Sequence, residues 1–110
     1  DERVMRAVLA EVRDRNLFFL DSYTSPGSTA AAMARSLGIP TLERDVFLDN
    51  SSDIQAIQRE LWAAADKASR SGRAVAIGHD RPETYEALRV TIPAIQRSGV
   101  RVCFLWDLLR

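Results

Sequence analysis

Hydrophobic and polar residues follow two different patterns along this chain. Short apolar runs that end in polar or ionisable residues are typical of buried strands, and they occupy residues 17–20, 41–45, 73–78 and 100–105. Apolar residues spaced three and four positions apart are typical of amphipathic helices, and they occupy residues 4–12, 29–37, 54–68 and 82–95. The sequence therefore predicts one helix followed by elements in the order β-α-β-α-β-α-β.

Strands that alternate with helices predict a parallel sheet with right-handed connections. The predicted fold class is α/β, built of parallel βαβ units, with residues 46–48 as an apolar plug in a βα loop. Four strands cannot close a barrel, which needs about eight strands. The edge strands of an open sheet have unpaired main-chain groups that can pair with further strands. We therefore expect further strands or a partner chain to cover the edge.

Length and composition narrow the class of protein. A chain of 110 residues makes at most one domain. Fifteen basic residues balance fifteen acidic ones, so charge gives no reason to expect a nucleic acid or a membrane surface as partner. The single cysteine, Cys103, lies in an apolar run and is predicted to be a core residue. The sequence begins at Asp1 rather than Met, so we expect a segment or a processed form of a longer protein.

Candidate site residues follow the predicted strands. In parallel α/β folds the functional site forms where the strands end and the βα loops begin. Asp21 follows the first strand, Arg44 and Asp45 end the second, and His79 and Asp80 follow the third. His79 is the only histidine, and an imidazole at such a position can act as a general acid or base near neutral pH or bind a metal.

Several of these residues allow more than one interpretation. Asp21 is either a catalytic carboxylate or a loop-capping one; a dehalogenase-type phosphatase is disfavoured because Tyr23 stands where a second aspartate is needed. Arg44 and Asp45 either orient a carboxylate in a pocket or form a structural ion pair. The loop at residues 25–29 could bind phosphate, although it lacks the lysine of a P-loop. One histidine and one buried cysteine make no three-ligand zinc cluster.

Three segments carry a family resemblance: Phe18 to Ser22 (FFLDS), Arg44 to Asn50 (RDVFLDN), and Ala76 to His79 (AIGH) with Thr84 after it. In this order and at this spacing they resemble the divergent polysaccharide deacetylase family, over nearly the whole chain. The resemblance implies a NodB-like (β/α) barrel, of which residues 1–110 correspond to the C-terminal half as a single domain or segment.

The resemblance also implies an activity and roles for residues. The implied activity is metal-dependent N-deacetylation of carbohydrate, the hydrolysis of an acetamide C–N bond, with His79 as the general acid toward the leaving amine. Asp21 and Asp45 would position substrate or orient His79. The remaining implied substrate-binding residues are Ser22, Arg44, Asp49 and Asp80. The alternative is a non-catalytic carbohydrate-binding or envelope-scaffold protein of deacetylase-like fold.

Cofactor, partners and location follow from the same resemblance. A divalent metal, with zinc the expected ion, belongs to the complete barrel, and its ligands lie on strands before this segment, so we expect no metal held by this segment alone. The expected partners are an acetylated polysaccharide or oligosaccharide and either the missing N-terminal half of the barrel or a second copy. The implied location is the bacterial periplasm or the extracellular space.

Overall fold

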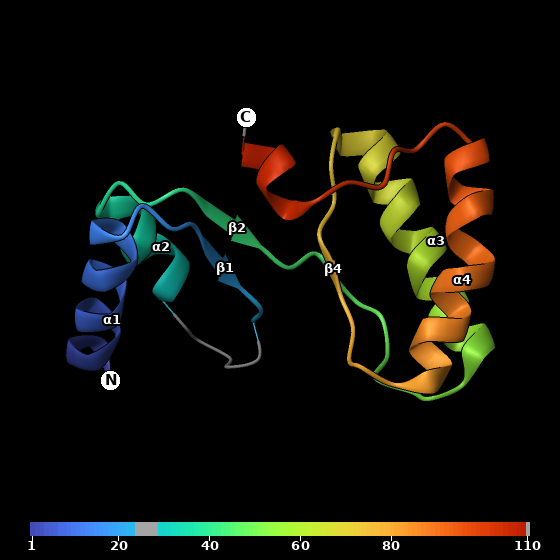
Figure 1. Ribbon diagram of the computed structural model, residues 1–110, viewed down its shortest axis with the longest axis horizontal. Coiled ribbons are helices and arrows are strands. Elements are labelled where there is room, and N and C mark those ends of the chain that lie inside the picture. Colours follow the sequence, from blue (N-terminus) through green and yellow to red (C-terminus); the bar gives the residue numbers. More distant parts are fainter. Residues whose placement is uncertain (24–28, 110) are drawn as a thin grey trace. The chain divides into compact units, whose positions relative to one another are not determined.

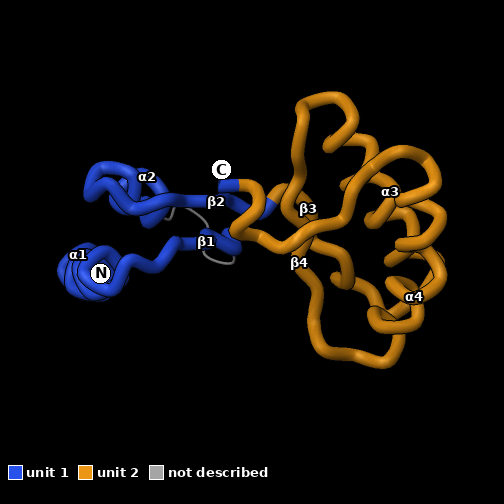
Figure 2. The backbone as a smooth tube through the Cα atoms, turned by 45° about the horizontal axis from the view of Figure 1, so that its top comes forward, with its two compact units in different colours: residues 1–44, 109–110 blue, residues 45–108 orange. Residues whose placement is uncertain are grey.

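The chain forms helices and short parallel strands in a computed structural model that describes residues 1–23 and 29–109 (Figure 1). Its elements are α1 (Glu2–Asp14), β1 (Phe19–Asp21), α2 (Ala30–Ser36), β2 (Thr41–Glu43), β3 (Val46–Phe47), α3 (Ile54–Ser71), β4 (Ala76–Ile77), α4 (Pro82–Arg97) and the 3-10 helix η1 (Leu105–Leu109). They divide into two compact units, unit 1 of residues 1–44 with 109–110 and unit 2 of residues 45–108 (Figure 2).

Unit 1 contains a βαβ arrangement in which β1 and β2 pair in parallel. Helix α1 begins at Asp1, whose carboxylate accepts the main-chain N–H of Arg3 and so satisfies one of the free N–H groups at the helix start. The core of this unit joins α1 to α2 and to the segment before β2, through Leu9, Met33, Ala34 and Ile39.

Unit 2 contains a second βαβ arrangement, in which β3 and β4 pair in parallel and α3 and α4 lie side by side (Figure 1). Helix α3 begins after Asp53, which caps the N–H of Ala56, and ends at Gly72, whose φ of 98° suits glycine. The core packs both helices against the end of β3 through Leu48, Ile57, Leu61, Ala65, Ala87 and Ile95. This core holds the residue that follows β3, Leu48, directly before the candidate site.

The observed elements confirm a mixed α/β fold with four helices and short parallel strands among the described residues. In the part of the chain that the structure describes, the strands form two pairs and no closed barrel, so the barrel type stays a prediction. Within the described residues, no helix has the length and apolar character needed to cross a membrane.

Two predicted elements were wrong. Residues 46–48, expected to be a loop with an apolar plug, contain strand β3, because the N–H groups of Val46 and Leu48 donate to Val75 and Ile77. Residues 100–105, expected to be a strand, pair with no strand in the described part of the chain and lead into η1. Val102 and Phe104 there are exposed, whereas a strand within a parallel sheet is covered on both faces.

Candidate functional site

Strands β3 and β4 bring two site residues together at their C-terminal ends. The pairing sets Val46 opposite Ala76 and Phe47 opposite Ile77. The same register, continued by two residues, sets Asp49 opposite His79. Because side chains alternate between the two faces of a strand, residues in matching positions point to the same side. The register therefore places a carboxylate and an imidazole next to each other.

The carboxylate of Asp49 is buried and accepts three hydrogen bonds. Its Oδ1 lies 2.7 Å from His79 Nδ1, and its Oδ2 accepts the main-chain N–H of His79 at 2.6 Å. Thr84, in the first turn of α4, donates its hydroxyl to the same Oδ2 at 2.6 Å. Asp49 is 1% exposed, so these donors replace the water that an ionised carboxylate needs.

These contacts determine the charge of Asp49. Burial alone would raise the pKa of a carboxyl group, but the donors from Thr84 and from the ring and main chain of His79 outweigh it and hold the pKa of Asp49 at about 2. The group is therefore ionised near neutral pH and can only accept hydrogen bonds. It follows that Nδ1 of His79 carries the proton and that, in the neutral imidazole, Nε2 has the free lone pair.

The imidazole of His79 is half-exposed, with 51% of its side chain accessible. The ring of Phe47, from the last residue of β3, lies against it with a centroid separation of 5.5 Å. An imidazole that is fixed through one nitrogen and exposed on the other side can exchange a proton with a bound molecule. This is the chemistry that the arrangement supports.

The loop after β4 is built closely around this pair. Arg81 donates from Nη1 to the main-chain oxygen of Asp49 at 3.0 Å. A Cβ atom at Gly78 would come within 3.1 Å of Thr84 Cγ2 and 3.5 Å of Asp49 Oδ2. A larger residue at position 78 would require the Thr84 side chain to shift slightly, because the backbone passes close to it. Asp80, which the sequence assigns to substrate binding, is exposed in this loop beside His79.

Asp45 occupies the other end of strand β3. Its Oδ1 accepts from Lys67 Nζ at 2.6 Å and its Oδ2 accepts the N–H of Val75 at 2.7 Å. Burial raises the pKa of Asp45. The hydrogen bonds from Lys67 and Val75, together with the nearby charges of Lys67 and Arg73, lower the pKa by more than burial raises it, so the net shift is downward. The sequence places Asp45 at the end of a strand, whereas it lies just before β3 begins. The structure does not bring it to His79.

Three other predicted site residues lie together in unit 1. Asp21, 7% exposed at the end of β1, accepts the N–H of Tyr23 through Oδ1 at 2.9 Å, while its buried Oδ2 has no hydrogen-bond partner among the described residues. Arg44 donates from Nε to the main-chain oxygen of Ser22 at 2.6 Å. Arg44 therefore braces the backbone that follows Asp21. The proposed phosphate loop lies outside the described residues except for Thr29, whose side chain makes no cap hydrogen bond to α2.

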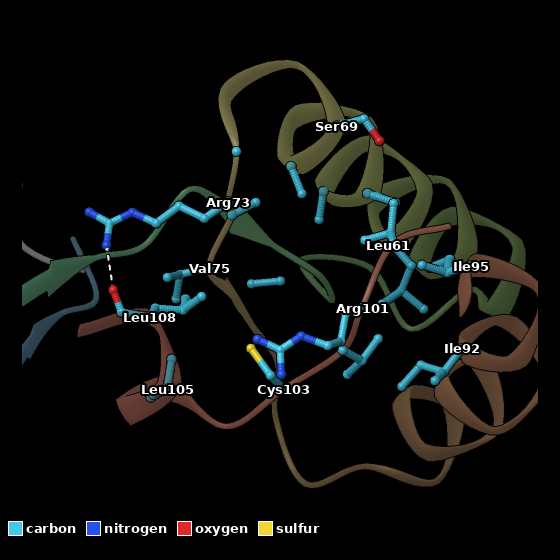
Figure 3. Close-up of a pocket in the computed structure, with 18 of the residues that line it drawn as sticks. Leu61, Ser69, Arg73, Val75, Ile92, Ile95, Arg101, Cys103, Leu105 and Leu108 are labelled. Atoms are coloured by element: carbon cyan, nitrogen blue, oxygen red, sulfur yellow. Dashed lines mark hydrogen bonds between the residues drawn. The ribbon is translucent and has the colours of Figure 1, made fainter. Parts of the chain in front are cut away.

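A separate apolar cavity of about 430 Å³ lies in unit 2 between α3, α4 and residues 99–108 (Figure 3). Its walls are mainly aliphatic, and Arg73 at its rim donates from Nη1 to the main-chain oxygen of Leu108 at 2.9 Å. Cys103, predicted to be a core residue, is half-buried and lines this cavity. Neither Asp49 nor His79 contributes to its wall, so the cavity is not the site around the imidazole.

Sequence reasoning missed the pairing of Asp49 with His79 and the part played by Thr84. It assigned Asp49 to substrate contact, whereas the carboxylate is buried against His79. The signal in the sequence was that residues 46–48 and 76–78, two runs of equal length without polar side chains, are followed directly by Asp49 and His79. Within the described ranges no three His, Cys, Asp or Glu side chains come together as a metal site.

Comparison with known proteins supports the family resemblance. An uncharacterized protein of Haemophilus influenzae (strain Rd) is 38% identical over 81% of this chain and 32% of its own length. Uncharacterized protein YibQ of Escherichia coli K12 is 36% identical over 77% of this chain and 27% of its own length. This chain therefore spans about a third of the length of these relatives.

A solved structure and a family profile extend the comparison. The crystal structure of an uncharacterized protein from Agrobacterium tumefaciens C58 matches 94% of this chain and 42% of its own, with a TM-score of 0.90 and 24% identity, which shows a shared fold. The sequence profile of the family described as divergent polysaccharide deacetylase matches residues 1–109. The chain belongs to the divergent polysaccharide deacetylase family.

Proposed function

We propose that this chain carries the general-acid half of a carbohydrate N-deacetylase site, with His79 as the acid and Asp49 as the residue that holds it. The observation that carries the proposal is the 2.7 Å contact between His79 Nδ1 and the ionised Asp49, at the C-terminal ends of paired parallel strands. Membership of the divergent polysaccharide deacetylase family supports the reaction class.

The reaction is hydrolysis of an acetamide on a sugar. Water adds to the carbonyl carbon, the C–N bond breaks, and acetate and an amine leave. The departing nitrogen needs a proton, and the imidazolium of His79 would give it from Nε2 and become neutral. Asp49 stabilises the imidazolium before the transfer and keeps the proton on Nδ1 after it, because its own pKa is about 2.

The substrate class, the surrounding fold and the location are parts of the same proposal. The substrate would be an acetylated polysaccharide or oligosaccharide, and the chain would form the C-terminal half of a NodB-like (β/α) barrel in the periplasm or outside the cell. The match to 42% of the Agrobacterium structure supports a position within a larger fold. Ser22, Arg44 and Asp21 would contribute to substrate binding, as would Asp80.

Metal dependence does not follow from the residues of this chain. The described residues offer no group of three metal-binding side chains and so do not fit a metal site. The divalent ion of the complete barrel, expected to be zinc, would need ligands from strands of the barrel outside this segment. No step proposed for His79 or Asp49 passes through it.

The test is acetate release from an N-acetylated oligosaccharide by a hybrid protein. In the hybrid, this chain replaces the matching segment of the Haemophilus relative. We expect the hybrid to release acetate, and the rate to fall about 100-fold or more in His79→Ala. The rate should also fall in Asp49→Asn, whereas Asp45→Asn should leave it unchanged. The two aspartates make a matched pair, because each accepts a main-chain N–H across the same strand pair.

Two outcomes would contradict the proposal. Acetate release by the 110-residue chain alone would show that the site is not divided as proposed. A folded hybrid that binds the oligosaccharide, releases no acetate and is unchanged by His79→Ala would favour the non-catalytic carbohydrate-binding alternative.

A further inference from the structure

Thr84 is a buried residue that contacts the site through Asp49. It is the third residue of α4, it is 3% exposed, and its hydroxyl donates to Asp49 Oδ2 at 2.6 Å. A threonine within a helix commonly bonds back to a carbonyl one turn earlier. This one bonds to a carboxylate from another element instead, which points to a task in holding that carboxylate.

The hydrogen bonds of Asp49 are divided unequally between its two oxygens. Oδ2 accepts from Thr84 and from the main chain of His79, whereas Oδ1 accepts from the imidazole Nδ1. Two donors on Oδ2 prevent the carboxylate from rotating about its own axis. The other oxygen therefore stays directed at the ring, and Arg81 holds the backbone of the same residue by donating to its main-chain oxygen.

We propose that Thr84 is a positioning residue which, through Asp49, holds His79 in the neutral tautomer that carries its proton on Nδ1 and leaves Nε2 free. Asp49 and the Phe47 ring contact the imidazole, while the charged residues Asp80 and Arg81 follow it in the chain and Arg81 binds the main-chain oxygen of Asp49. The chemical value of the tautomer rests on the proposed function, because an Nε2 without a proton can take one and return it. The tautomer itself exists without substrate.

A second threonine of the same helix provides a matched control. Thr91 is also 3% exposed, and within the described residues its hydroxyl has no hydrogen-bond partner. Thr84→Val and Thr91→Val therefore make the same chemical change in the same helix at the same burial. Only the first removes a donor from Asp49.

The experiment is ¹⁵N NMR of the imidazole in the 110-residue chain, above the pH at which the ring is protonated. His79 is the only histidine, so its two ring nitrogens give unambiguous signals. We expect the Nδ1–H tautomer to dominate in the unaltered chain. In Thr84→Val the ratio of the Nδ1–H tautomer to the Nε2–H tautomer should fall about tenfold, because a tenfold change corresponds to the free energy of one ordinary hydrogen bond. Thr84→Ser should restore the ratio, and Thr91→Val should leave it unchanged.

The outcomes separate this inference from the proposed function. A folded Thr84→Val chain with an unchanged tautomer ratio overturns the positioning role, even if the hybrid deacetylase depends on His79. A shifted ratio with rescue by serine supports it, even if the hybrid releases no acetate. If the valine variant does not fold, Thr84→Ala removes the same hydroxyl without crowding, and the same ratio decides the question. An equal shift in Thr91→Val would also overturn it.

Discussion

Asp45 and Asp49 lie on either side of strand β3, and each accepts a main-chain N–H from a residue beside β4, Val75 before it and His79 after it. Their other contacts differ. Asp45 binds the ammonium group of Lys67, from α3, whereas Asp49 binds the imidazole that opens the loop after β4. The first carboxylate joins a helix to the strand pair, and the second controls a group that can exchange protons. One residue type thus serves two purposes according to the end of the strand at which it lies.

Acid should remove the contribution of Asp49 to stability. Its pKa in the folded chain is about 2, below the ordinary value of 3.8, so its stabilisation is complete above about pH 4 and is lost as the pH falls toward 2. The loss is on the order of 2 kcal/mol. We expect the free energy of unfolding, measured by urea denaturation, to fall less across this range in Asp49→Asn than in the unaltered chain. Equal falls in the two proteins would contradict this assignment.

Asp45 should be needed for stability and not for the imidazole. Asp45→Ala leaves the N–H of Val75 without its acceptor, so we expect a loss of about 1–3 kcal/mol in the free energy of unfolding. Lys67→Met removes only a partly exposed ion pair and should cost about 1 kcal/mol or less. Neither change should alter the NMR tautomer ratio of His79. A changed tautomer ratio of His79 in a folded Asp45→Ala chain would show that Asp45 does influence the imidazole and would contradict this prediction.

At the scale of elements, β4, its outgoing loop and the start of α4 are packed so closely that a side chain at Gly78, which lies between them, would press on its neighbours. Gly78 has no positive φ that calls for glycine, but a Cβ there would meet Thr84 Cγ2 at 3.1 Å and Leu48 Cδ1 at 3.4 Å. The apolar run before His79 was predictable from local sequence, whereas the crowding at Gly78 was not. The crowding comes from Leu48, which follows β3, and from Thr84 of α4, which approach Gly78 in space.

Gly78→Ala tests this close approach. We expect it to cost about 1–3 kcal/mol of stability, because the neighbours must shift to admit a methyl group. In a Thr84→Ser background the nearest of those neighbours, Cγ2, is absent. The cost of Gly78→Ala should then be smaller by about 0.5–1 kcal/mol in a double-mutant cycle measured by denaturant unfolding. Additive costs would show that the crowding lies elsewhere.

At the scale of the whole molecule, the described residues form two hydrophobic cores that share no residue. Leu9 is fully buried in the core of unit 1, and Ile57 is fully buried in the core of unit 2. Each core encloses the helix of its own βαβ arrangement, α2 in one and α3 in the other. Damage to one core should therefore loosen its own unit first.

Hydrogen exchange can show this separation. We expect Leu9→Ala, which should cost about 2–5 kcal/mol, to speed exchange of amides in residues 1–44 more than in residues 45–108, and Ile57→Ala to do the reverse. Val8→Ala changes an exposed residue on the same helix as Leu9 and should alter exchange little. Uniform acceleration throughout the chain in both core variants would show that the two units unfold as one.

The amino-acid sequence alone determined the helices, the parallel α/β class, the three family segments and the place of His79 in a loop after an apolar run, because each depends on local spacing or on short runs of residues. Only the tertiary structure decided that residues 46–47 form a strand, that residues 100–105 do not pair, and that Asp49 rather than Asp45 contacts the imidazole. Those outcomes depend on which strands pair and in what register. Register is set by contacts between residues about thirty positions apart, and no local pattern records it.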